Sequence, residues 1–221
     1  MVKMLPEYHD LHIHTVFSDG STEVEDVVRR ASELRIGAIG ITDHFWPSLG
    51  GRRGGKKLIE RRREIIEEMR AAHPHMLILD GAEVDVQSDG TLAPVAGGLE
   101  QFDLVIASIH FQCSSSQWVS LIRRLVSNEF FHILGHWDGY LSSFRQQDGE
   151  VVASLLAKAG VAVELSARYE TRHPEFLEAA RDAGCKFTFG SDAHWVDEVG
   201  RIGDLRTLAR DMRLSLLSEI K

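Results

Sequence analysis

Short apolar runs alternate with longer stretches of helical periodicity along almost the whole chain. This alternation is typical of βα units, in which a helix connects two parallel strands of one sheet. Runs with the length and composition of buried strands occupy residues 8–14, 37–43, 81–86, 103–110, 131–136, 161–165 and 186–191. Segments with helical spacing of apolar residues occupy 22–34, 58–72, 118–126, 150–159, 174–183 and 204–217.

Individual residues indicate where some of these elements begin. The apolar stripe of the first helix consists of Val24, Val27, Val28, Ala31 and Leu34. Ser21 or Thr22 is placed to cap this helix, and Pro174 opens the helix at 174–183. Residues 76–79 lead into the third strand, and no clear helix joins the third strand to the fourth.

Seven strands with intervening helices predict an α/β fold in which the strands close, or nearly close, into a barrel. An open doubly wound sheet is the alternative, but no glycine-rich GxGxxG turn follows the first strand. The composition does not change along the chain, and we find no linker or low-complexity tail. We therefore expect one domain over residues 1–221.

The composition is that of an ordinary globular protein, with 43% hydrophobic and 26% charged residues among 221. A formal net charge of −8 argues against general attraction to nucleic acid, because the overall field repels a polyanion. Cys113 and Cys185 are far apart and lack CxxC spacing, which suggests reduced thiols. The sequence shows no signal peptide and no apolar run of about 18 residues, so we expect a soluble, cytoplasmic protein without a membrane partner.

The residues that can carry chemistry gather at one place in the predicted fold, the carboxyl ends of the strands. Because side chains alternate along a strand, His12 and His14 point to the same side of the first one. Asp19 follows on the next loop, and the later strands end in His44, Glu83, His110, His136, Asp192 and His194. These ends converge on one face of a βα barrel, which predicts a site with enough ligands for two or three metal ions.

Each of these residues also has a purely structural interpretation. Taken alone, His110 or His136 fits a hydrogen-bonded core histidine, Glu83 a buried salt-bridge partner, and residues 191–194 a turn with a helix cap. Their recurrence at the end of successive strands favours one shared site. By contrast, the segment 73–75, His-Pro-His, is interpreted as a solvated helix end.

Seven motifs resemble, in order and spacing, the polymerase and histidinol phosphatase (PHP) family of metal-dependent phosphoesterases. They are DLHIHT at 10–15, SDG at 18–20, ITDH at 41–44, GAE at 81–83, SIH at 108–110, GH at 135–136 and GSDAH at 190–194. The match extends over nearly the whole chain. It implies a distorted seven-stranded (β/α)7 TIM-like barrel, in agreement with the strand count.

The resemblance further implies three divalent ions of zinc, manganese or iron. The first is expected on His12, His14, Glu83 and Asp192. The second is expected on Glu83, His110 and His136, and the third on Asp19, His44 and His194. Many family members carry histidine at the position of Asp19, and a harder carboxylate there leaves the metal and the filling of the third site open. Such ions lower the pKa of a shared water, here held beside Glu83, for in-line attack on a phosphate.

Arg168, just after the sixth strand, is the candidate phosphate-binding residue, because a guanidinium matches two phosphate oxygens. A surface salt bridge with Glu170 is the alternative. His173 is a candidate proton donor to the leaving group. The segment 49–57 is predicted to be a basic loop that contains Arg52, Arg53, Lys56 and Lys57. This loop is either a lid over an anionic substrate or simply solvated. Neither cysteine has the histidine partner that a thiolate nucleophile needs.

We therefore expect metal-dependent hydrolysis of a small phosphomonoester. Segments 109–111 and 135–138 are most similar to the histidinol phosphatase branch, so L-histidinol phosphate is the leading substrate, although the long insertions of that branch are missing. A nucleotide or short-oligonucleotide phosphoesterase of the 3'-5' exonuclease type is the enzyme alternative. A metal-holding accessory module without catalysis is the non-enzymatic one. The sequence leaves the oligomeric state open.

Overall fold

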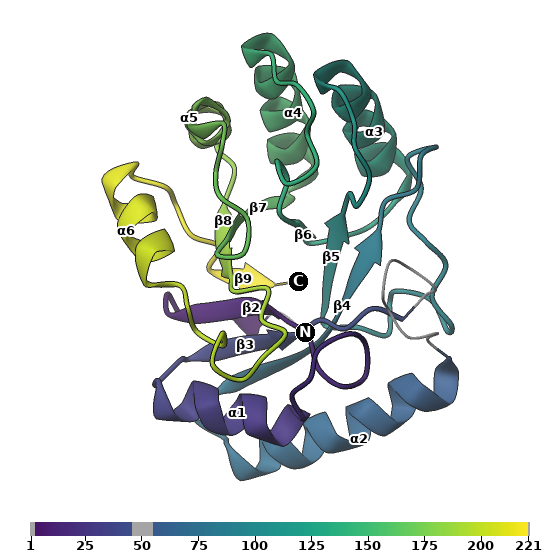
Figure 1. Cartoon of the computed structure of the whole chain (residues 1–221), viewed down its shortest axis with the longest axis vertical. Helices are drawn as coiled ribbons and strands as arrows, with labels where there is room; N and C mark the ends of the chain where they lie inside the picture. Colours follow the sequence, from purple (N-terminus) through teal and green to yellow (C-terminus); the bar gives the residue numbers. More distant parts are fainter. Residues whose placement is uncertain (1–2, 46–54, 221) are drawn as a thin grey trace.

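The computed structural model describes residues 3–45 and 55–220, and its centre is a parallel sheet. The strands follow one another in space as β2 (His9–Ile13), β3 (Ala38–Ile41), β4 (Leu77–Asp85), β5 (Leu104–Ser108), β6 (Ile133–Leu134), β7 (Ala162–Ser166) and β8 (Phe187–Gly190). The sheet curls until β2 meets the end of β8, where the Asp192 amide donates to the His12 carbonyl at 2.8 Å. The result is a nearly closed barrel, as predicted, and not an open sheet (Figure 1).

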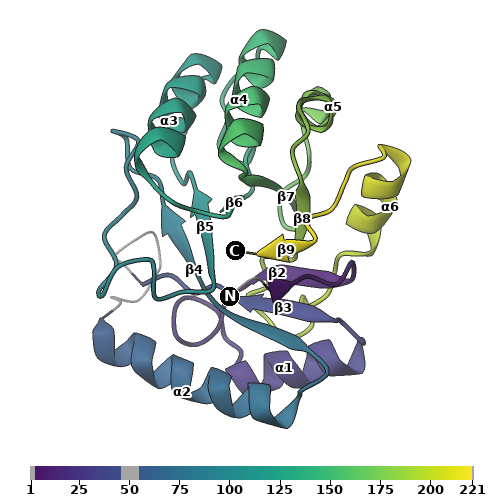
Figure 2. The same cartoon turned by 180° about the vertical axis from the view of Figure 1, so that it is seen from behind.

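In the described residues six helices surround the barrel: α1 (Val24–Glu33), α2 (Lys56–Ala72), α3 (Ser115–Asn128), α4 (Gln146–Ala159), α5 (Pro174–Ala183) and α6 (Gly203–Asp211). Figures 1 and 2 show α1 and α2 side by side on one flank of the strands, and α3, α4 and α5 on the opposite flank. As predicted, no helix lies between β4 and β5. None of these helices has the length and apolar character required to span a bilayer.

The amino end of the barrel is filled with apolar side chains. Alternate strand residues form a buried cluster inside it, consisting of Leu5, Leu11, Ala38, Leu79, Leu104, Ile106, Ile133, Ala162 and Ile220. Leu5 follows, and Ile220 belongs to, a small antiparallel sheet of β1 (Lys3–Met4) and β9 (Glu219–Ile220), which the strand pattern did not predict. Since this end is plugged, polar chemistry is confined to the carboxyl end, as is usual in βα barrels.

The predicted terminal helix over 204–217 is wrong in its second half. Helix α6 ends at Asp211, and Arg213 adopts the left-handed conformation with φ 57°. Beyond this turn the Phe187 amide donates to the Ser215 carbonyl at 3.0 Å, and the Leu217 amide donates to the Phe187 carbonyl at 2.9 Å. The chain therefore runs extended beside β8, because that pairing satisfies its backbone.

The predicted cap of the first helix is also wrong. Helix α1 begins at Val24, and its N-cap residue, Glu23, makes no side-chain capping bond. The Ser21 hydroxyl donates instead to the His194 carbonyl at 2.9 Å. The Thr22 carbonyl accepts from the Val16 amide at 3.1 Å. Both residues are thus used to hold the loop after β2.

Other element boundaries differ in length. Strand β4 is continuous from Leu77 to Asp85, so the segment 76–79, predicted only to lead into the third strand, is largely part of it. Strand β6 keeps only two residues of the predicted 131–136. Helix α3 begins at Ser115 and not at residue 118, because the Gln117 side chain accepts from the Ser114 amide at 2.8 Å and completes a capping box. Helix α4 begins at Gln146 and not at residue 150.

Candidate metal centre

All nine predicted metal ligands lie together at the carboxyl end of the barrel. They form four overlapping groups, and within each group one ligand atom per residue lies within 4.8 Å of the others. The groups are His12, His14 and Glu83; His14, Asp192 and His194; His14, Asp19 and His44; and Glu83, His110 and His136. The strand ends thus bring into one site residues that are up to 182 positions apart, from His12 to His194.

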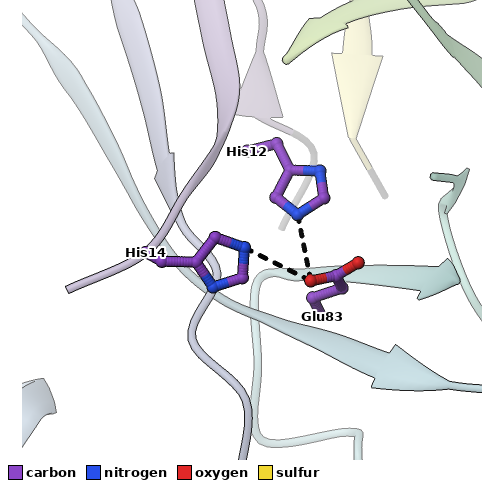
Figure 3. A group of neighbouring side chains, drawn as sticks. All are labelled: His12, His14 and Glu83. Carbon is purple, nitrogen blue, oxygen red and sulfur yellow. Dashed lines mark ion pairs between the residues drawn. The ribbon is translucent and has the colours of Figure 1, made fainter. Parts of the chain in front are cut away.

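His12 and His14 reach this site through an irregular strand. Asp10 pairs with Ile39 and Ile13 with Ile41, so β2 carries one more residue than β3 between these points. A bulge of this kind turns a side chain toward a new direction, and bulges occur often beside active sites. Figure 3 shows both imidazoles directed at Glu83. The predicted convergence is correct, although simple alternation does not produce it.

The first group has the spacing of ligands around a single ion. The Nε2 atoms of His12 and His14 lie 3.1 and 3.2 Å from Oε2 of Glu83, and His14 Nε2 lies 3.3 Å from Oδ1 of Asp192. In a tetrahedral site with bonds of about 2.0–2.1 Å, ligand atoms lie roughly 3.3 Å apart. His12 Nε2 and both nitrogens of His14 are buried, and the carboxylate oxygens near them do not lie in hydrogen-bonding geometry. A cation among these atoms would satisfy both the nitrogens and the carboxylates.

The second group lies on the other side of Glu83. His136 Nε2 is 2.9 Å and His110 Nε2 is 3.4 Å from Oε1 of Glu83, and the two nitrogens are 3.2 Å apart. Oε1 of Glu83 therefore faces one group while Oε2 faces the other. Glu83 would thus present one carboxylate oxygen to an ion in each group.

The third predicted set is looser than the other two. Oδ2 of Asp19 lies 3.3 Å from His194 Nε2 and 3.8 Å from His44 Nε2. Asp19 with His44, and His194 with Asp192, each form a compact group only together with His14. Nδ1 of His14 is 3.4 Å from Oδ1 of Asp19. The Asp19 and His194 side chains are 21% and 20% exposed. The more open face of the site is therefore the one that carries Asp19 and His194.

Two carboxylates behind the ligands fix the orientation of the imidazoles. Oε1 of Glu164 lies 2.7 Å from His12 Nδ1, and Oδ1 of Asp85 lies 2.5 Å from His110 Nδ1. With Nδ1 engaged in this way, Nε2 of each ring is directed into the site, as in other metal-binding histidines. The sequence predictions gave neither carboxylate a role. The signals were a lone charge in the buried strand 161–165 and the same-side spacing of Asp85 and Glu83.

Glycine makes room for the Glu164 carboxylate inside the barrel. A Cβ atom at Gly190 on β8 would lie 2.0 Å from Oε1 of Glu164. A Cβ atom at Gly135, after β6, would lie 2.3 Å from the hydroxyl of Ser108. Any larger residue at these positions would displace Glu164 or its neighbours. The two glycines therefore allow a side chain from β7 to cross the barrel to His12.

The carboxylates also set the charge of the histidines. Burial disfavours the imidazolium of His14, but the Asp192 and Glu83 carboxylates raise its pKa to about 9. Burial also disfavours the imidazolium of His110, but the Asp85 and Glu83 carboxylates raise its pKa to about 10. Burial likewise opposes the charge on Glu83, yet the surrounding histidines hold its pKa well below the usual range. The site is thus built to hold positive charge.

A cavity of about 320 Å³ opens above these groups. Arg168 lines it, and its Nε donates to the Asp192 carbonyl at 3.1 Å while its NH2 lies 2.7 Å from His194 Nδ1. Among the described residues its ion pairs run to Asp192 and Glu198, at 3.5 and 3.7 Å, and not to Glu170. The cavity wall also includes two tyrosines whose hydroxyls are 3.4 Å apart, Tyr140 and Tyr169.

Other sequence candidates lie away from the cavity or outside the described residues. The His173 ring stacks on Phe144, with ring centroids 4.6 Å apart, and does not line the cavity. Of the predicted basic loop, Arg52 and Arg53 lie outside the described residues, and Lys56 and Lys57 begin α2. Both cysteines are buried, and burial raises the pKa of the Cys185 thiol to about 11.

A model of the PHP domain matches residues 10–168. The chain belongs to the PHP family. The match includes every candidate ligand except Asp192 and His194, which the fold brings back to the same site. As a member of the PHP family the protein is a hydrolase, a metal-dependent phosphoesterase.

Relatives of known name divide between nucleases and phosphatases. The chain is 28% identical over 208 residues to the DNA polymerase/3'-5' exonuclease PolX of Bacillus subtilis; the match covers 90% of the chain but only 35% of PolX. A probable phosphatase of Thermoanaerobacter is 28% identical over 212 residues, which cover 87% of the chain and 81% of that protein. The histidinol phosphate phosphatase of Lactococcus lactis, solved with Zn, L-histidinol and phosphate, has the same fold, with a TM-score of 0.73 over 97% of both chains at 19% identity.

Proposed function

We propose that this PHP protein hydrolyses a small phosphomonoester and that L-histidinol phosphate is the leading substrate. The observation that carries the proposal is the small cavity that is lined by seven of the nine candidate metal ligands and by Arg168. Its volume of about 320 Å³ suits a phosphate with a small alcohol better than a polymer. The Lactococcus lactis protein of the same fold was solved with L-histidinol and phosphate, which supports this choice.

The chemical roles follow from the positions of the side chains. When bound, divalent ions at such a centre supply an activated water and neutralise phosphate charge. His12, His14 and Asp192 would hold an ion on one side of Glu83, and His110 and His136 would hold another on its other side. The looser set that includes Asp19 would hold a third. We propose that the ions are zinc, manganese or iron. Zinc is supported by the Lactococcus lactis structure, which contains it.

Arg168 is the proposed phosphate-binding residue. Its side chain is 35% exposed and lines the cavity beside Asp192, so the guanidinium can turn toward a bound anion. A planar guanidinium offers two parallel donors to phosphate oxygens. Tyr140 and Tyr169 stand against His110 and His136, with ring centroids 5.7 Å apart for Tyr140 and His110 and 4.6 Å for Tyr169 and His136. These rings would contact the alcohol that leaves.

A nucleotide or short-oligonucleotide phosphoesterase remains the second candidate. The similarity to PolX, a DNA polymerase/3'-5' exonuclease, favours it, because that match covers 90% of the chain. The net charge of −8 opposes long nucleic acids but not a mononucleotide or a short single strand. The two free, buried cysteines agree with a reducing compartment, and the cytoplasm is the proposed location.

The test measures what the metal-loaded protein releases from a panel of esters, as phosphate from monoesters and as mononucleotides from DNA. The panel contains L-histidinol phosphate, p-nitrophenyl phosphate, nucleoside monophosphates and a short single-stranded DNA. We expect kcat/KM for L-histidinol phosphate to exceed that of p-nitrophenyl phosphate by tenfold or more. Equal or lower values would remove histidinol phosphate as the substrate, and preferential removal of 3'-terminal nucleotides would establish the second candidate.

A further inference from the structure

Arg62 of α2 is a fully buried cation behind the metal centre, with 0% of its surface exposed. Its NH1 donates to the Ile41 carbonyl at 3.2 Å and to Oδ2 of Asp43 at 2.9 Å. Its NH2 donates to the Gly81 carbonyl at 2.6 Å and to Oδ1 of Asp80. One helix side chain therefore binds the end of β3 and the middle of β4 together.

Asp43 extends this contact to the loop after β2. Its Oδ1 accepts from the Thr15 amide and from the Ser18 hydroxyl, both at 2.7 Å. Its Oδ2 accepts from the Thr15 hydroxyl at 2.8 Å as well as from Arg62. The carboxylate is buried, and four donors surround it. It is thereby fixed in one orientation.

Each segment in this network carries a candidate metal ligand. Thr15 directly follows His14, Ser18 precedes Asp19, and Asp43 precedes His44; Gly81 lies two residues before Glu83. The Ser18 hydroxyl also lies 3.2 Å from Oδ1 of Asp19. The network thus reaches the more open, looser half of the centre and does not include the segments of His110 and His136.

The network has no net charge, since Arg62 and Arg63 alternate with Asp43 and Asp80. Arg63 donates from Nε to Oδ2 of Asp80 at 2.6 Å, and its side chain is 31% exposed. Buried ion pairs of this kind give little net stability compared with well-packed apolar residues, because desolvation offsets the attraction. The position of Arg62 therefore needs an explanation other than stability.

We propose that Arg62 and Asp43 are positioning residues that hold His14, Asp19 and His44 in the geometry for an ion. The proposal rests on the proposed metal-dependent function and extends it to α2. Preorganisation matters most where ligands are loosely spaced, as around Asp19, because a flexible set must be ordered when the ion binds. In the second group, Asp85 orients His110, and the segments of His110 and His136 lie outside this network.

The test compares metal binding by chelator-stripped Arg62→Met with that of the wild-type chain and of Arg63→Met. Arg63→Met is the matched control, since it removes the neighbouring cation from Asp80 but leaves Asp43 untouched. Competition with a chromophoric chelator reports the number of ions and the Kd of each. In Arg62→Met we expect the ion at Asp19 and His44 to bind about 10–100-fold more weakly. The ion at His110 and His136 should keep its Kd within about twofold, as all ions should in Arg63→Met.

Ser18→Ala provides a second variant in case Arg62→Met does not fold. It removes one hydroxyl between Asp43 and Asp19, and Ser127→Ala, an exposed helix serine, is its control. We expect the same ion to be weakened in Ser18→Ala, with circular dichroism unchanged and turnover recovering at high metal concentration. Equal weakening of all ions, or unchanged binding in Ser18→Ala, would overturn the proposal. Failure of the proposed function is a different result, since it appears as absent phosphate release by the metal-loaded wild-type chain.

Discussion

Glu164 offers the sharpest single test of how the metal centre is built. Its carboxylate is 1% exposed and has two partners. Oε1 lies 2.7 Å from His12 Nδ1, and Oε2 accepts from the His136 amide at 2.6 Å. If His12 binds an ion through Nε2, its Nδ1 must carry a proton, so both partners of Glu164 are donors. The change Glu164→Gln keeps the size and shape of the side chain. The amide, however, has one acceptor oxygen, and the two donors of His12 and His136 each need one.

The expected cost follows from this count. One buried donor in Glu164→Gln meets an amide NH2 and loses its acceptor, which costs roughly 1–3 kcal/mol of folding free energy. For a domain of this size about 2–4 °C of Tm is lost per kcal/mol. Loss of a carboxylate behind a metal-bound histidine also weakens metal affinity by about 10–100-fold. Both His12 and His136 contribute ligand atoms, so two neighbouring ions should be affected.

The assay is metal competition together with thermal unfolding of the metal-free and metal-loaded chain. Glu178→Gln, an exposed position on α5, is the control and should behave as wild type in both measurements. The difference in Tm between loaded and metal-free protein should shrink in Glu164→Gln. If Glu164→Gln binds metal as tightly as wild type, Glu164 does not support metal binding by orienting His12, and the reasoning fails.

Three further predictions concern the ligands and the substrate. His12→Ala or Asp192→Ala should abolish turnover while the circular dichroism stays native; either variant with most of its activity would show that the ligands are misassigned. Arg168→Ala should raise KM for the phosphoester by tenfold or more, with partial recovery in Arg168→Lys, and an unchanged KM would remove Arg168 from phosphate binding. Because the raised pKa values of His14 and His110, about 9 and about 10, keep both rings protonated at neutral pH without metal, metal binding should release protons and weaken as the pH falls. Calorimetry in two buffers of different ionisation enthalpy measures this release, which would total about two protons for these rings; identical enthalpies in both buffers would refute it.

The sequence predicted the site best where side chains of the metal-binding types recur along the chain. Histidines and carboxylates recur at the ends of successive apolar runs, and the structure brings all nine together. The seven strands follow from the same alternation of runs and helices. These features were predictable because side-chain type and strand position are both local properties. The grouping of Glu83 with His110 and His136 was predicted from family resemblance, and its geometry agrees.

What the sequence did not reveal depends on contacts between distant segments. Glu164 looks like an isolated charge in a strand until Gly190 on β8, Gly135 after β6 and His12 across the barrel are placed beside it. Arg62 lies in a strongly charged helix, where nothing marks it as buried. The end of the terminal helix was also unpredictable, because pairing with Phe187 outweighed the helical pattern there.

The central claim is that this PHP chain hydrolyses a phosphomonoester through metal ions held by the nine ligands. The most direct measurement is phosphate release by chelator-stripped protein as one, two and three equivalents of divalent metal are added back. We predict no release without metal and a rate that rises to its maximum within two or three equivalents. A metal-free chain that hydrolyses the ester as fast as the loaded one would contradict the account.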